Sequence, residues 1–231
     1  MGGTGIAIDR REAASALRWW LESGVDIAVQ ETPRNWLERL PELPKTGTGA
    51  PRELPETLEA FRDWLASHPE APLATARSKA VRPQGLPGAD VMVIAEPPTR
   101  EELASGAPIG GDAAELMQRM LEAIGMANSA YLANIACFAS PPGNLSASHL
   151  EKCAESARRH VSLVQPKRLL ILGDVPSRAL LGKKLLEARG HVHKVEGVRA
   201  VVTFHPRQLL RRPSDKALAW RDLLLLVEDE Q

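Results

Sequence analysis

The chain has 231 residues, and its 29 Lys and Arg residues are balanced by 29 Asp and Glu residues, so the formal charge is zero. That balance gives the whole protein no general attraction to nucleic acid, and any basic surface must be local. No apolar run approaches the roughly 20 residues of a membrane span, and the two cysteines, Cys137 and Cys153, are too few for a disulfide framework. The first residues lack a basic segment followed by an apolar core, so we expect no secretory signal and a cytoplasmic protein with reduced thiols.

The first quarter of the chain is expected to be a helical extension followed by a linker. Residues 10–22 place apolar side chains at helical spacing, and a second short helix is predicted near Trp36. Pro and Gly residues punctuate the stretch 41–55 and exclude regular structure there. We therefore predict an extension over residues 1–55, of open role, and one α/β domain over residues 56–231.

Beyond residue 90 the pattern changes to short apolar runs separated by helical spacing. The four runs are Val91–Ala95, Tyr131–Ile135, Leu169–Leu172 and Ala200–Phe204. Such runs are typical of strands buried on both faces of a parallel sheet. The helical patterns cover residues 56–66, 112–124, 147–164, 175–181 and 216–228. The alternation predicts a three-layer α/β sandwich with a central, mostly parallel four-stranded sheet flanked by helices.

Polar side chains follow these strands, at the edge where ligands bind in open parallel sheets. Glu96 and Glu102 follow the first run, Asn134 lies at the end of the second, and His205 follows the fourth. Each has an ordinary structural explanation, as a loop carboxylate, a turn former or a helix-entry residue. Their joint placement at strand ends favours a functional site.

Six segments of the chain carry a resemblance to a known family. They are Ala95-Glu96-Pro97-Pro98-Thr99, residues 106–111, Tyr131-Leu132-Ala133-Asn134, residues 140–144, residues 166–173, and His205-Pro206 with the Leu-Leu-Arg stretch that follows. In order and spacing they resemble the motifs of the uracil-DNA glycosylase superfamily, in particular its family 4, the iron–sulfur type. The resemblance runs from about residue 56 to the end of the chain.

The resemblance implies hydrolysis of the N-glycosidic bond of uracil, or of another deaminated base, in DNA at the start of base-excision repair. Such an enzyme takes the nucleotide out of the base stack. By resemblance, Glu102 positions a water, Asn134 both donates to and accepts from the base edge, and His205 stabilises the departing base. Glu96 either assists the water or holds its own loop.

The expected base pocket departs from the family pattern. Pro108 and Ile109 are the expected contacts with the base, and Ile109 stands where the family has a Phe that stacks on it. Stacking is worth about 1–3 kcal/mol per base, so we expect weaker capture of the base. Pro97-Pro98 stiffens the preceding loop and removes two N–H donors. These departures leave open a non-catalytic member of the superfamily that binds DNA or a damaged base without turnover.

A locally basic stretch follows His205 and is predicted to contact DNA. Leu209 and Leu210 are the expected wedge into the base stack, and the arginines that flank them are expected to bind phosphates. These arginines are Arg207, Arg211 and Arg212. The alternative is a helix-capping turn whose leucines pack into the core. A third hypothesis, an α/β protein that acts on a free nucleotide or another small molecule, has no use for such a loop. The predicted partner is therefore DNA that contains uracil or another deaminated base.

The family holds an iron–sulfur cluster through four cysteines, and this chain departs from that pattern. The family's N-terminal Cys-x-x-Cys pair corresponds to about His68–Leu73 of this chain, where no cysteine stands. Cys153 fits the fourth ligand position, and Cys137 fits the third poorly. Because a cluster needs its full ligand set, we predict no cluster and no other cofactor. His191 and His193 lack a partner that would complete a metal site, and we expect them on a hairpin or loop surface.

Overall fold

The computed structural model describes residues 54–75, 79–140 and 145–228. They belong to the second of two units into which the chain divides, Glu53–Gln231. The predicted helices at residues 10–22 and near Trp36 lie outside the described residues, so the domain boundary near residue 55 stays a prediction. No helix in the described stretches is long and apolar enough to cross a membrane.

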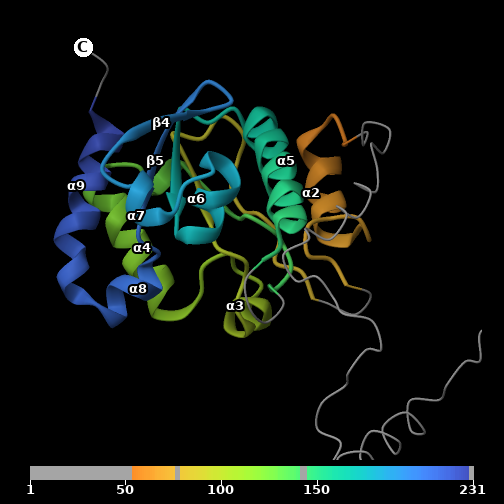
Figure 1. Ribbon diagram of the computed structural model, residues 1–231, viewed down its shortest axis with the longest axis horizontal. Coiled ribbons are helices and arrows are strands. Elements are labelled where there is room, and N and C mark those ends of the chain that lie inside the picture. Colours follow the sequence, from red (N-terminus) through yellow and green to blue (C-terminus); the bar gives the residue numbers. More distant parts are fainter. Residues whose placement is uncertain (1–53, 76–78, 141–144, 229–231) are drawn as a thin grey trace, which may run out of the picture. The chain divides into compact units, whose positions relative to one another are not determined.

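A five-stranded sheet forms the middle of the described unit, in the order β2-β1-β3-β5-β4 (Figure 1). The strands are β1 (Val91–Ala95), β2 (Ala130–Asn134), β3 (Arg168–Leu172), β4 (Val192–Val195) and β5 (Val198–Thr203). The strands β2, β1, β3 and β5 run parallel, and β4 pairs antiparallel with β5 at the edge. The predicted three-layer, mostly parallel architecture is confirmed.

The predicted count of four strands is wrong by one, because β4 was not foreseen. This strand has four residues, of which two are exposed and only Val195 is buried, so it lacks the buried apolar run that marks the others. Glu196 and Gly197 join it to β5 at φ values of 49° and 78°, and a type I′ hairpin turn requires positive φ at both positions. His193 therefore lies on a hairpin, as expected.

Helices cover both faces of the sheet. They are α2 (Leu58–Ser67), α3 (Arg100–Ser105), α4 (Gly111–Ala123), α5 (Ala147–Val164), α6 (Asp174–Leu181), α7 (Leu185–Ala188), α8 (Pro206–Arg211) and α9 (Lys216–Val227), with short 3₁₀ turns at Ala127–Ser129 and Pro213–Asp215. Figure 1 shows α4, α8 and α9 on one side of the sheet and α2, α5 and α6 on the other. Every residue of β1 is buried, as expected for a central strand covered on both faces.

The order of the strands brings four loops to one edge of the sheet. Ala95 pairs with Asn134 at the ends of β1 and β2, and Leu172 pairs with Thr203 at the ends of β3 and β5. The chain winds from β1 outward to β2 and then returns past β1 to β3. The point between β1 and β3 is therefore a topological switch point, where open α/β sheets bind their ligands.

A buried polar cluster connects α2 and α5 to β2. Arg62 Nε donates to the Tyr131 hydroxyl at 2.9 Å, and the hydroxyl lies 2.7 Å from His160 Nε2. Arginine only donates, so the Tyr131 hydroxyl oxygen accepts from Arg62, and the tautomer of His160 sets which of the two side chains donates in the second hydrogen bond. Burial, with the Arg62 charge nearby, lowers the pKa of His160 to about 3, so the ring is neutral.

Candidate active site

The helix α3 begins with a capping box that fixes Glu102 beside the loop after β1. Thr99 donates to Glu102 Oε2 twice, from its backbone N at 2.8 Å and its hydroxyl at 3.0 Å. Arg207 Nη1 donates to the same oxygen at 2.9 Å. Glu102 is only 2% exposed, and its second oxygen, Oε1, is buried without a hydrogen-bond partner among the described residues. Thr99 and Arg207 thus hold Oε2 of the carboxylate, and Oε1 is left to accept a hydrogen bond.

Glu96 connects the loops after the parallel strands. Its Oε1 accepts from Asp174 N at 3.2 Å, and its Oε2 lies 3.5 Å from Arg207 Nη2. Gly173 makes this approach possible, because a Cβ at that position would lie 2.4 Å from Glu96 Oε1. The backbone oxygen of Glu96 accepts from Asn134 Nδ2. Of the two interpretations of Glu96, these contacts favour the one in which it holds its loop.

Asn134 ends β2 with its side-chain amide turned to neighbouring backbone. Its Nδ2 donates to the backbone oxygens of Glu96 at 2.7 Å and Pro108 at 2.9 Å. Oδ1 is buried and has no partner in the part of the chain that the structure describes. Pro108 and its neighbour Ile109 are both buried beside this contact. The amide was expected to donate and accept toward a base, but in this structure its two hydrogens already have acceptors.

His205 caps the N-terminus of α8 and is a neutral donor. Its Nδ1 accepts from Arg207 N at 3.2 Å, so the hydrogen of the neutral ring lies on Nε2. Burial and the nearby Arg207 charge lower the pKa of His205 to about 3. Nε2 is buried and has no partner among the described side chains and backbone. The ring therefore presents one unpaired N–H.

Within residues 54–75, 79–140 and 145–228, three buried side-chain polar atoms lack a hydrogen bond, and they are Glu102 Oε1, Asn134 Oδ1 and His205 Nε2. Folded proteins pair nearly all such atoms, so each exception needs an explanation. The three residues are also joined by Glu96 and Arg207, through the contacts given above. They offer a carboxylate acceptor, an amide acceptor and a neutral N–H donor at one edge of the sheet.

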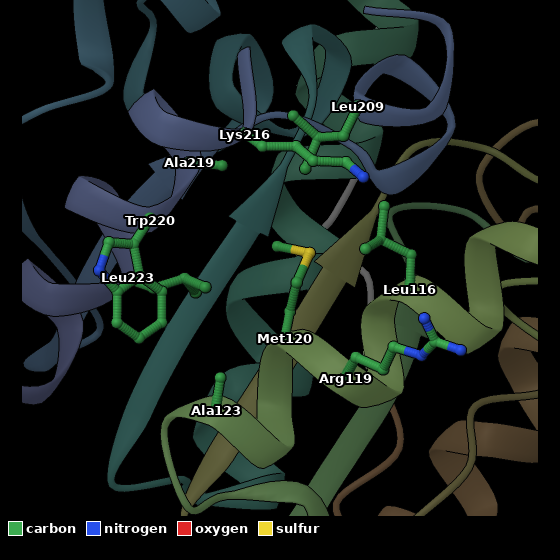
Figure 2. A pocket seen from close by; sticks show the side chains of 9 residues that line it. All are labelled: Leu116, Arg119, Met120, Ala123, Leu209, Lys216, Ala219, Trp220 and Leu223. Carbon is green, nitrogen blue, oxygen red and sulfur yellow. The ribbon is translucent and has the colours of Figure 1, made fainter. Parts of the chain in front are cut away.

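The two leucines of α8 lie in different environments. Leu209 is 1% exposed and lines an apolar pocket of about 190 Å³ between α4 and α9. Figure 2 shows Leu209 near Leu116 and Met120 of α4 at this pocket. Leu210 is 42% exposed. The prediction that Leu209 forms part of a DNA wedge is therefore at odds with its place in the core, whereas Leu210 is accessible.

The three arginines predicted to bind phosphates also lie in different environments. The guanidinium of Arg207 is paired with Glu102 and lies near Glu96, so it is already committed to carboxylates. Arg211 and Arg212 are exposed, and neither forms an ion pair with the described residues. The structure thus keeps Arg211 and Arg212 available and gives Arg207 a position inside the site.

Two of the contacts at this edge were missed by sequence reasoning. Gly173 and Asp174 directly follow the third predicted strand, but the sequence pattern predicted no role for them. A glycine directly after a buried strand was the available signal, because its φ of +102° is open mainly to glycine. No such signal pointed to the contacts of Arg207 with Glu102 and Glu96, since Glu102 lies 105 positions away in the sequence.

The residues present do not fit a four-cysteine cluster. The whole chain has two cysteines, and both Cys137 and Cys153 are buried. Burial raises the pKa of each thiol to about 12, whereas a metal ligand must be a thiolate. His68, at the place of the missing pair, uses its Nδ1 to accept from Glu70 N. In the described residues, no group of three or more His, Cys, Asp or Glu side chains is arranged to hold a metal ion.

The fold and the site define an α/β protein with a buried polar site at the switch point of a mostly parallel sheet. The family model described as the uracil DNA glycosylase superfamily matches residues 83–224. That match spans more than half of the chain, and the chain belongs to the uracil DNA glycosylase superfamily.

Curated relatives carry the name type-4 uracil-DNA glycosylase. The protein of Pyrobaculum aerophilum is 24% identical over 180 residues, which cover 73% of this chain and 92% of that protein. The protein of Archaeoglobus fulgidus is 28% identical over 138 residues, or 54% of this chain and 69% of that protein. The protein of Sulfurisphaera tokodaii is 24% identical over 186 residues, or 75% and 84%. The resemblance to family 4 is confirmed.

Proposed function

We propose that the protein is a DNA glycosylase that hydrolyses the N-glycosidic bond of uracil, or of another deaminated base, at the start of base-excision repair. The observation that carries the proposal is the set of three buried, unpaired polar atoms on Glu102, Asn134 and His205. Membership of the superfamily and the names of the relatives support the same reaction class.

In the proposed reaction, the extruded nucleotide loses its base to water. The bond between C1′ and the base nitrogen breaks, and its electron pair leaves with the base as an anion delocalised onto the ring oxygens. Water adds its oxygen to C1′, and the proton that it loses ends on the released base anion through solvent, which gives the neutral base and an abasic sugar. The neutral His205 Nε2–H suits the stabilisation of an anionic base oxygen, because a fixed donor in a buried site stabilises developing charge without reorganisation.

Glu102 Oε1 is suited to orient the attacking water and to face the positive charge that develops on the sugar. Thr99 and Arg207 hold the other carboxylate oxygen, so the side chain is fixed before the substrate arrives. Such pre-positioning lowers the entropic part of the barrier. Glu96 supports this geometry through Arg207 and Asp174.

Asn134 Oδ1 is suited to accept a hydrogen from the edge of the base. Uracil carries hydrogen on N3, whereas cytosine has a lone pair there, so an acceptor at this point favours the deaminated base. On the DNA side, the exposed Leu210, Arg211 and Arg212 provide an accessible apolar tip and two cations beside the site, as expected of a loop that contacts phosphates and bases.

A cleavage assay tests the proposal. Labelled oligonucleotides that contain uracil, hypoxanthine or xanthine, single-stranded or mismatched, are incubated with the full chain and treated with alkali to reveal abasic sites. We expect abasic product from at least one of them, lost in Asn134→Ala, His205→Ala and Glu102→Gln with DNA binding retained. His191→Ala, at an exposed histidine away from the site, is the control and should cleave normally. Absence of product with intact DNA binding would instead indicate a non-catalytic binding protein.

A further inference from the structure

A second hollow lies beside the buried site, between α7 and α8 (Figure 1). Its volume is about 490 Å³, within the roughly 300–1,000 Å³ of clefts that hold small-molecule ligands. Phe204, which directly precedes His205, lines it. So does Asp174, whose backbone N–H donates to Glu96. The hollow therefore lies at the same edge of the sheet as the proposed base site and adjoins it.

The surface inside the hollow is partly apolar. Phe204 and Leu185 are buried, and they line it together with the partly buried Leu218. Leu186 of α7 also lines it and is 75% exposed, so folding leaves most of its apolar surface to a ligand. A nucleobase has two apolar faces, which enzymes that unstack DNA hold between aromatic and aliphatic side chains. The hollow offers side chains of both kinds.

The charged groups around the hollow suit a nucleotide. Each carboxylate that lines it accepts a hydrogen bond from the protein, and the pairs are Leu185 N with Asp174 Oδ1 (3.0 Å), Lys184 N with Glu187 Oε2 (3.3 Å) and Gln208 Nε2 with Asp215 Oδ2 (3.3 Å). The cations that line it, Lys184 and Arg212, form no ion pair with the residues that the structure describes. Cations bind the phosphates of nucleic acids, and the amino groups on base edges can lie beside carboxylates, as a phosphate alone cannot.

Resting on the proposed glycosylase function, we infer that this hollow is a second nucleotide subsite, which holds the base next to the extruded one on the same DNA strand. Leu186 packs on that base, and Lys184 and Arg212 bind the phosphates beside it. The occupant belongs to the lesion strand because the hollow adjoins His205, and the DNA backbone brings the neighbouring nucleotide there.

The subsite has a consequence for the form of DNA that the protein prefers. A base held in the hollow is neither stacked nor paired. In a duplex, release of this additional base from the stack costs about tenfold in affinity. In a single strand, the base has no pairing partner to lose. The protein therefore binds single-stranded DNA in preference to duplex DNA.

Binding of single-stranded oligonucleotides by the full chain tests the subsite. Each carries uracil on a 2′-fluorinated sugar, whose glycosidic bond resists cleavage because fluorine disfavours positive charge on the sugar. An abasic spacer replaces the base at each flanking position in turn, so that the phosphates stay in place. Loss of the base at one position adjacent to uracil should weaken binding by about fivefold or more, and loss of more distant bases should have smaller effects.

Variants of the hollow should separate its two kinds of contact. Leu186→Ala should remove the dependence on the adjacent base, since the contact is already lost. Lys184→Ala should weaken binding of all the oligonucleotides alike and make the salt dependence shallower by about 0.7 in log–log slope. Leu86→Ala and Lys167→Ala are the matched controls and should bind as the unaltered protein does, because these exposed residues precede β1 and β3 at the opposite edge of the sheet.

A spacer effect of the same size in Leu186→Ala would overturn the inference, and so would equal sensitivity at every flanking position. The unaltered protein should bind the single strand about tenfold more tightly than the same strand in a duplex, and Leu186→Ala should narrow this difference. Equal or tighter binding of the duplex would overturn the inference as well. If uracil is not released in the cleavage assay but the effect of the adjacent base is present, the proposed function fails and the subsite stands.

Discussion

Arg207 Nη1 lies 2.9 Å from Glu102 Oε2, and the backbone N–H of the same arginine donates to His205 Nδ1 at 3.2 Å. One residue therefore holds the carboxylate and sets the tautomer of the imidazole. Its second guanidinium nitrogen reaches Glu96 Oε2 at 3.5 Å. In the proposed enzyme, Arg207 is a positioning residue that links the loop after β1 to the start of α8.

Replacement of Arg207 by Ala should slow base release by about tenfold to a hundredfold, because a small misplacement of reacting groups has effects of that size. Removing one donor to the buried Glu102 carboxylate should also lower the free energy of unfolding by about 1–3 kcal/mol. Arg207→Lys should recover only part of the rate, since one ammonium cannot bridge two carboxylates as a guanidinium does. Single-turnover kinetics and urea unfolding measure the two effects.

Added guanidinium ion should partly restore the rate of Arg207→Ala, which a purely structural role would not produce. Arg211→Ala, on the exposed side of the same helix, is the control and should keep the cleavage rate at saturating enzyme. Normal cleavage by Arg207→Ala would exclude the positioning role.

Gly173→Ala should damage the site through Glu96. The glycine has φ of +102°, and a Cβ there would lie 2.4 Å from Glu96 Oε1, so the substitution adds a clash to backbone strain of about 1–3 kcal/mol. Gly190 has φ of +77° with nothing within 4 Å of an added Cβ, so Gly190→Ala carries the strain alone. We expect both variants to unfold at lower urea and only Gly173→Ala to lose base release. Equal activity of the two variants would argue against a role for the Glu96 contact.

The adjacent leucines of α8 should respond differently to truncation. Leu209→Ala removes a core side chain and should cost about 2–5 kcal/mol of stability, with DNA affinity of the folded protein preserved. Leu210→Ala should leave stability within about 0.5 kcal/mol and weaken binding to DNA. The logarithm of DNA affinity falls linearly with the logarithm of salt concentration, and Arg211→Ala and Arg212→Ala should each make this slope shallower by about 0.7–0.9. Unchanged affinity and slope in all three exposed variants would remove this helix from the DNA interface.

Acid should destabilise the fold through its two buried histidines. His160 and His205 have pKa values lowered from 6.5 to about 3 by burial, so the unfolded chain binds more protons than the folded one between these values. Stability is therefore fully present above pH 6.5 and is lost as the pH falls toward 3. Each histidine should contribute a loss of about 2 kcal/mol between pH 7 and pH 5.

Urea unfolding at pH 7 and pH 5 measures this loss. His160→Gln keeps a hydrogen-bond partner for Tyr131 but cannot be protonated in this range. It should therefore remove about half of what the two histidines contribute to the pH dependence of the free energy of unfolding. His191→Gln, at an exposed ring, should leave the pH dependence as it is. A pH dependence of His160→Gln equal to that of the unaltered protein would contradict the neutral, buried His160.

The sequence predicted the parallel strands well because their signal is strong. Val91–Ala95 was placed to the residue, since a run of five apolar residues between polar ones fits only an element buried on both faces. The strand β4 and the short helices α3 and α8 gave no comparable signal. Each has six residues or fewer, too few for a periodic pattern to emerge.

The site was predicted as a set of residues and not as a set of contacts. Glu102, Asn134 and His205 were named from motifs, and within the described stretches they are the residues with unpaired buried side-chain atoms. The occupied donors of Asn134 depend on where two backbone oxygens lie, which no side-chain identity reveals. Leu209 and Leu210 are equivalent in the sequence, and only the orientation of α8 against α4 decides which of them is buried.

The burial of both cysteines has a practical consequence for studies of this protein in solution. With Cys137 and Cys153 the only thiols in the chain, and both enclosed with pKa values near 12, alkylating dyes and spin labels should leave the native protein untouched. A cysteine introduced at Leu210 would then be the single reactive handle. Attached to a probe or to a modified oligonucleotide, it would report directly on how α8 meets a DNA strand, without first removing any native thiol.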